Sequence, residues 1–177
     1  IMHRDSLGYT QPIRPGEVNW MTAGSGIVHS ERTDPLKKSQ GGPMHGMQAW
    51  VALPVEKEEI APSFTHLGEE AQPSDQSNGV FTRLVAGEAF GERAGTPVES
   101  PLYYLHYELP TGGRFTPPPG PGQAGGYAER SIYVAAGSVE IDHQRYHTGQ
   151  MMVFSAHADP VITALEPSTV MSLGGEP

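Results

Sequence analysis

Short runs of apolar or alternating residues, separated by turn residues, recur along the whole chain. The longest stretch without glycine or proline is 138–148, and Asp142, His143 and Gln144 place a turn inside it. Long helices therefore have no room. The runs have the length and spacing of strands in an antiparallel sandwich or barrel. We expect strands at 17–21, 46–53, 80–86, 102–109, 131–135, 139–141, 151–154, 161–165 and 170–173.

The run 102–109 shows the pattern most clearly. Four apolar or aromatic residues share one face, whereas the other face includes His106 and Glu108. This alternation is typical of a strand with one buried and one wetter face. We expect two irregular segments as well: the polar, acidic stretch 66–78 as a surface loop, and the stretch 110–126, rich in proline and glycine, as an extended connection.

Composition and charge exclude several classes of function. The formal net charge is −9 and the chain has no cysteine, so direct nucleic-acid binding is disfavoured. Disulfides, thiolate metal sites and a cysteine nucleophile are excluded. No apolar run approaches the length of about 20 residues that a membrane span needs. We expect a soluble protein of the cytoplasm, or of the nucleus in a eukaryotic cell.

A weak internal repeat indicates two related halves. Residues 14–31 align with 147–165 after one insertion, and each copy has a turn glycine, an apolar strand, a short loop and a second apolar strand. A turn near 97–101 precedes a new strand, so we expect domains at 1–98 and 99–177. The first copy carries His29 and Glu31, where the second carries Thr163 and Leu165. We therefore expect no metal in the second half, because threonine and leucine cannot replace imidazole and carboxylate.

His29 and Glu31 are the candidate metal ligands. They lie two residues apart on an expected strand, so both side chains leave the same face. Imidazole and carboxylate suit a divalent first-row ion, and open positions on that ion suit non-haem iron chemistry. The apolar run around Trp20 and Met21 favours a closed barrel that holds the pair inside. The alternative is a solvated strand face without metal.

The other histidines support weaker expectations. His3 and His45 lie near the candidate pair in sequence motifs, so each is either a residue that orients the ligands or a surface residue. His106 is expected to pack or to make hydrogen bonds. The remaining four are expected on the solvated surface: His66, His143, His147 and His157.

Several sequence segments together resemble the pirin family of the cupin superfamily. The segments that carry this resemblance are 3–8, 13–31, 45–54, 86–91, 100–103, 137–141 and 174–177. The resemblance implies an all-β bicupin of two antiparallel jelly-roll β-barrels. It also implies one mononuclear Fe(II) per chain in the N-terminal barrel, with His29 and Glu31 among its ligands, and a metal-free C-terminal barrel.

Three departures from the family pattern lead to further expectations. The family's His-x-His metal pair would precede His3, so we expect the N-terminal barrel to be incomplete in this chain. Strands from another segment or chain would then complete it. The family's helical tail would follow 174–177. Ser25 stands where pirins commonly have arginine, which we expect to change the mouth of the pocket.

The resemblance leaves three functions open. The first is a quercetin 2,3-dioxygenase-type oxidoreductase that opens a flavonol ring with O2, with Glu31 as both a metal ligand and the catalytic base for the flavonol proton. The alternative is an iron-dependent regulatory protein that binds a partner protein, as a transcriptional co-regulator does, without turnover. The third is a metal-free barrel in which the pair is vestigial.

Overall fold

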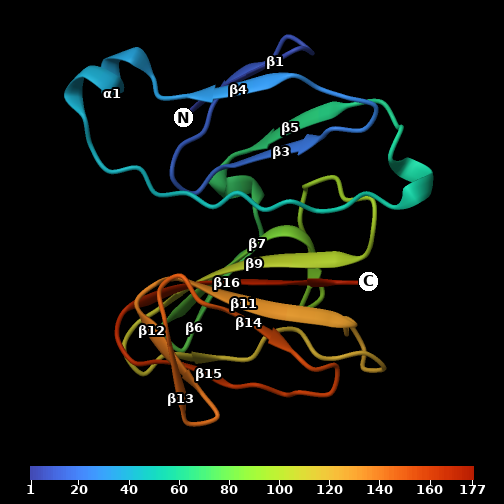
Figure 1. Cartoon of the computed structure of the whole chain (residues 1–177). Helices are drawn as coiled ribbons and strands as arrows, with labels where there is room; N and C mark the ends of the chain where they lie inside the picture. Colours follow the sequence, from blue (N-terminus) through green and yellow to red (C-terminus); the bar gives the residue numbers. More distant parts are fainter. The chain divides into compact units, whose positions relative to one another are not determined.

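Strands are the main regular structure in the computed structural model, which describes residues 1–177 apart from the side chains of Pro35 and Leu36 (Figure 1). The chain forms two compact units, Ile1–Ala71 and Gln72–Pro177. The first contains β1 (Met2–Asp5), β2 (Thr10–Pro12), β3 (Val18–Thr22), β4 (His29–Arg32), α1 (Pro35–Gln40), the 3-10 helix η1 (Val55–Lys57), β5 (Ser63–Leu67) and η2 (Glu69–Ala71). The second contains β6 (Ser74–Ser77), β7 (Val80–Ala89), β8 (Glu92–Arg93), β9 (Leu102–Leu109), β10 (Arg114–Phe115), β11 (Glu129–Ala136), β12 (Ser138–Ile141), β13 (Gln144–His147), β14 (Met151–Phe154), β15 (Ile162–Ala164) and β16 (Ser168–Gly175).

Every strand pairing is antiparallel, which confirms the predicted fold class. The first unit has a three-stranded sheet in the order β2-β1-β4 and a two-stranded sheet, β3-β5. His3 of β1 stacks on Phe64 of β5, with ring centroids 4.3 Å apart. The inner faces of these two small sheets therefore meet at this pair.

Two sheets enclose the apolar core of the second unit. One follows the order β14-β11-β16-β9-β7-β6, with β8 paired to β7, and the other follows β10-β15-β12-β13. Tyr107 of β9 stacks on Phe115 of β10 at 3.8 Å, which joins the two sheets. The inner face of β9 is buried as expected, and on its other face His106 is half-buried and Glu108 is exposed.

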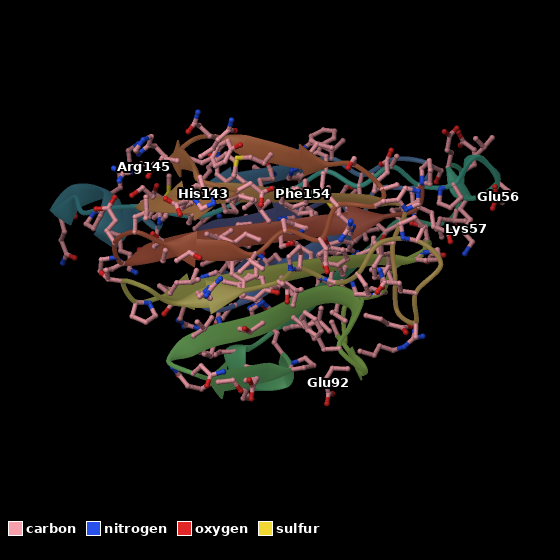
Figure 2. All side chains as sticks on the ribbon, turned by 90° about the horizontal axis from the view of Figure 1, so that it is seen from below. Glu56, Lys57, Glu92, His143, Arg145 and Phe154 are labelled. Carbon is pink, nitrogen blue, oxygen red and sulfur yellow. The ribbon has the colours of Figure 1, made fainter. Side chains whose placement is uncertain are left out.

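The hairpin between β12 and β13 also agrees with the sequence analysis. Asp142 and His143 both have positive φ, at 49° and 64°, as a tight two-residue hairpin turn requires. His143 is exposed at this turn, and Arg145 is exposed on β13 (Figure 2). The surface positions expected for His143, His147 and His157 are confirmed.

Two expectations about local structure are wrong. Residues 41–54 have no regular structure, although a strand is expected at 46–53, and Trp50 is 91% exposed. Among the strands of the described chain, none pairs with this segment, so its backbone lacks the ladder that stabilises a strand. The segment 66–78, expected to be a loop, instead contains η2 and β6, and β6 pairs with β7 through a turn at Asn78 and Gly79.

The domain boundary after residue 98 stays a prediction. The strands β6 and β7 precede that position, and β7 pairs with β9 inside the large sheet of the second unit.

Within the described chain, no helix has the length and apolar character needed to cross a membrane.

Arg130 is a buried cation that ties two loops to β11. Arg130 is only 1% exposed to solvent. Nη1 donates to the carbonyl oxygen of Pro118 at 3.2 Å, and Nη2 donates to those of Ala156 at 3.2 Å and Ala158 at 2.6 Å. These carbonyls belong to the connection before β11 and to the loop after β14, so one guanidinium supplies hydrogen-bond donors to both loops.

Asp5 fixes the turn between β1 and β2. Its Oδ1 accepts the backbone N–H groups of Leu7 at 2.9 Å and Tyr9 at 3.0 Å, while its Oδ2 accepts a hydrogen bond from His3 Nε2 at 2.9 Å. Burial of the carboxyl favours its neutral form. The hydrogen bonds from His3, Tyr9 and Leu7 outweigh this and lower the pKa of Asp5 below its usual value of 3.8.

Replacing Arg130 by methionine should destabilise the protein. Arg130→Met keeps much of the side-chain length but leaves three or more carbonyls without a donor, so we expect a loss of about 2–4 kcal/mol in the free energy of unfolding. Urea unfolding measures this loss. Arg114→Met, at an exposed position, is the control and should change stability by less than about 0.5 kcal/mol. Equal stabilities of the two variants would contradict the role given to Arg130.

Asp5 should make stability depend on acid pH. Because its folded pKa lies below 3.8, the ionised carboxylate contributes stability that is fully present above 3.8 and is lost as the pH falls through the folded pKa. Asp5→Asn keeps the Oδ1 acceptor for the turn but removes the charge. We expect the difference in urea midpoint between wild type and Asp5→Asn to be constant near neutral pH and to shrink in acid. Asp142→Asn, in an exposed turn, is the matched control, and a difference that grows in acid would show the assignment to be wrong.

Candidate metal centre

The pairing of β1 with β4 brings four potential ligand or proton-carrying side chains to one face. In this register His3 lies opposite Glu31, and Asp5 lies opposite His29. Residues two apart on a strand point to the same side, so both pairs occupy the same face of the sheet. This is the face that meets β5 at Phe64.

Local contacts at the start of β4 set this register. Ser6 N–H donates to the carbonyl of Val28 at 2.8 Å, and the Ser6 hydroxyl accepts the N–H of Val28 at 3.1 Å. The preceding turn is anchored by Ser25, whose N–H donates to the carbonyl of Ile60 at 2.9 Å. Gly24 has a φ of +50°, and a Cβ there would collide with the same Ile60 carbonyl. A larger residue at Gly24 would therefore shift the entry to β4.

His3 lies at the centre of the cluster. The residue is 2% exposed, and its ring lies nearly parallel to Phe64, with an interplanar angle of 11°. The His29 ring stacks at a centroid distance of 5.7 Å and an angle of 22°. The second ring nitrogen of His3, Nδ1, lies 3.9 Å from Glu31 Oε1. His3 thus contacts both candidate ligands, while its Nε2 is engaged by Asp5.

The structure places His29 and Glu31 together but not in an enclosed interior. Both residues are exposed, and the Glu31 side chain is 37% exposed. The expected enclosure is wrong for the described chain because the five strands of the first unit form two small sheets that do not close around β4. Within the described residues, no three histidine, aspartate or glutamate side chains are arranged to hold an ion. An imidazole and a carboxylate on one face nevertheless fit part of a divalent metal site.

The structure also places the remaining residues considered from the sequence. His45 is exposed in the irregular segment 41–54, whereas His3 is buried beside the pair. Thr163 lies in β15 opposite Glu140 of β12, in the second unit. Leu165, just beyond that strand, donates its backbone N–H to the carbonyl of Ser138.

His66 is not the solvated loop residue that the sequence analysis expects. It lies in β5 with its side chain 25% exposed, and its Nδ1 is 2.8 Å from Asn19 Oδ1. Its Nε2 lies 3.9 Å from Glu17 Oε2. Phe64 and Thr65, whose residue types are enriched in strands, are the local signal that could have indicated this strand.

His106 agrees with its expected packing role. It lies opposite Arg83 of β7, and its ring meets the Phe81 ring edge-on at 6.2 Å. Burial is the main cause that lowers the pKa of His106; Glu108 opposes this and Arg83 adds to it. Burial thus favours the neutral form of His106, and the residue belongs to the packing of the second unit.

Comparisons with known proteins find matches along this chain. The Pirin family model matches residues 1–51, and the model of the Pirin C-terminal cupin domain matches residues 104–177. A pirin-like protein of Caulobacter vibrioides is 53% identical over 178 residues, which cover 100% of this chain and 59% of that protein. A Pseudomonas aeruginosa protein named as a candidate quercetin 2,3-dioxygenase is 33% identical over 177 residues, covering 99% of this chain and 53% of that protein.

A solved structure shows the same fold. The crystal structure of a quercetin 2,3-dioxygenase from Acinetobacter baumannii superposes with a TM-score of 0.85 at 28% identity, covering 99% of this chain and 56% of that chain. The chain thus spans little more than half the length of these relatives. Two matching family models and close relatives along its whole length establish that the chain belongs to the pirin family of cupins.

Proposed function

We propose that this chain carries part of the metal centre of a mononuclear non-haem iron oxidoreductase, of the type that opens a flavonol ring with O2. The observation that carries the proposal is the placement of His29 and Glu31 on one face of β4, opposite Asp5 and His3 of β1. The names of two similar proteins as quercetin 2,3-dioxygenases support the reaction class.

The residues of this chain would act as metal ligands, as a general base and as a support for the ligands. His29 offers a ring nitrogen and Glu31 offers a carboxylate oxygen as ligands. A bound ferrous ion supplies electron transfer between flavonol and O2. Glu31, whose side chain is partly exposed, accepts the proton of the flavonol hydroxyl as a general base. The stacked rings of His3 and Phe64 form an aromatic support beneath the pair.

A second candidate function is iron-dependent regulation through a partner protein. The net charge of −9 favours this candidate, because an acidic surface attracts a basic partner. The two candidates differ in turnover: only the first consumes a flavonol, whereas both require metal at His29 and Glu31.

Removing the imidazole ligand should weaken metal binding. We expect His29→Ala to lower the affinity for Fe(II) by at least about 10-fold, because direct ligands matter more than the residues around them. Anaerobic titration with Fe(II) measures the affinity. His143→Ala, at an exposed turn of the second unit, should bind like the wild type. If His29→Ala also binds like the wild type, the pair is not the metal site.

Removing the base should slow turnover of the flavonol. With Fe(II) and O2 supplied, we expect Glu31→Gln to lower the rate of quercetin consumption by about 10²-fold or more, since general bases contribute that much. The decrease in flavonol absorbance measures the rate. Glu108→Gln is the control, because the Glu108 side chain is 64% exposed on a strand of the second unit. A wild type that binds Fe(II) at this pair without consuming flavonol would favour the regulatory function.

A further inference from the structure

We propose that His3, oriented by Asp5, is the positioning residue for the ligand pair His29 and Glu31. The inference rests on the proposed function, since it concerns how that pair is held ready for metal. It assigns His3 and Asp5 a role in ordering two exposed side chains and does not make either of them a ligand.

The first step is the anchoring of Asp5. Its Oδ1 is held by the backbone N–H groups of Leu7 and Tyr9 in the turn after β1. Its Oδ2 is then directed toward His3 Nε2, at 2.9 Å. A carboxylate can only accept, so the Nε2–H of His3 donates to it. The hydrogen bond fixes which edge of the imidazole faces Asp5, and the other edge, with Nδ1, faces Glu31.

The second step is the immobilisation of the His3 ring. The ring is buried and lies 4.3 Å from the Phe64 ring, close to parallel. A rotation of the ring would break both this stack and the hydrogen bond to Asp5. His3 is thus held by β5 on one side and by its own strand on the other, and it provides a rigid surface.

The third step is the contact of this rigid surface with the ligand pair. Glu31 lies directly opposite His3 in the strand register, and the His3 Nδ1 atom is 3.9 Å from its Oε1. The His29 ring stacks on the His3 ring, with centroids 5.7 Å apart. His29 and Glu31 are otherwise exposed, so the contacts with His3 restrict their rotamers. Side chains ordered before binding lose less entropy when they take up a metal.

The alternative for His3 is a purely structural role as a buried ring between the sheets. His3→Phe separates the two, because phenylalanine keeps the ring packing against Phe64 but loses both ring nitrogens. Asp5→Ser is a second variant that keeps an acceptor for the turn: its hydroxyl can accept the turn N–H groups, but it has no second oxygen to accept the Nε2–H of His3. His66→Phe is the matched control, since His66 lies in the same unit and pairs with Asn19.

The experiment uses the whole chain and has two readouts. In metal-free protein, three-bond NMR couplings report whether χ1 of His29 and Glu31 occupies one rotamer or several. Titration with Co²⁺ alone, followed by its visible absorption, reports the affinity of the pair. We expect averaged couplings and about a 10-fold weaker Co²⁺ affinity in His3→Phe and Asp5→Ser. His66→Phe should keep wild-type couplings and affinity.

The outcomes separate the inference from the proposed function. Wild-type couplings in both His3→Phe and Asp5→Ser would overturn the positioning role, whatever the metal does. If His3→Phe does not fold, the couplings of Asp5→Ser alone decide. If the couplings change but His29→Ala binds Co²⁺ as tightly as the wild type, the positioning role stands and the proposed metal centre fails.

Discussion

The register between β1 and β4 is the constraint on which the candidate site depends. Side chains alternate along a strand, so a slip of one residue would place His3 and Asp5 on the opposite face from His29 and Glu31. The contacts between Ser6 and Val28 and the turn at Gly24 hold β4 in place. These contacts, rather than attraction among the four site side chains, thus decide which groups meet.

Much of the fold could be predicted from local patterns. The strand 102–109 shows a two-residue period in the sequence and is observed with the same ends, because that period records which face is buried. The strand expected at 46–53 shows the limit of such patterns. A local pattern shows that a segment is compatible with a strand, but a strand also needs a neighbouring strand for its backbone hydrogen bonds. The loop expected at 66–78 is wrong for another reason. Asn78 and Gly79 are a strong hairpin signal, but the polar residues before them favoured a loop over the observed strand β6.

Only two of the four residues of the candidate site could be predicted as ligands from the sequence. His29 and Glu31 could be found because their spacing and the family resemblance lie in one short stretch. The connection between Asp5 and His3 could not be found in this way, since it depends on a turn that fixes a carboxylate and on a partner strand more than 20 positions away in the sequence. The burial of His3 against Phe64 needs a third strand, β5. Resemblance identifies ligands, whereas the residues that order them emerge from three-dimensional packing.

The central claim is that this register assembles the four side chains, and cross-strand nuclear Overhauser effects test it most directly. The account predicts contacts between the backbones of residues 3 and 31 and of residues 5 and 29, together with contacts from the His3 ring to the rings of Phe64 and His29. Backbone contacts that pair Arg4 with Glu31 would mean a register shifted by one residue. That result would contradict the account, because His3 and Asp5 would then face away from the metal-binding pair.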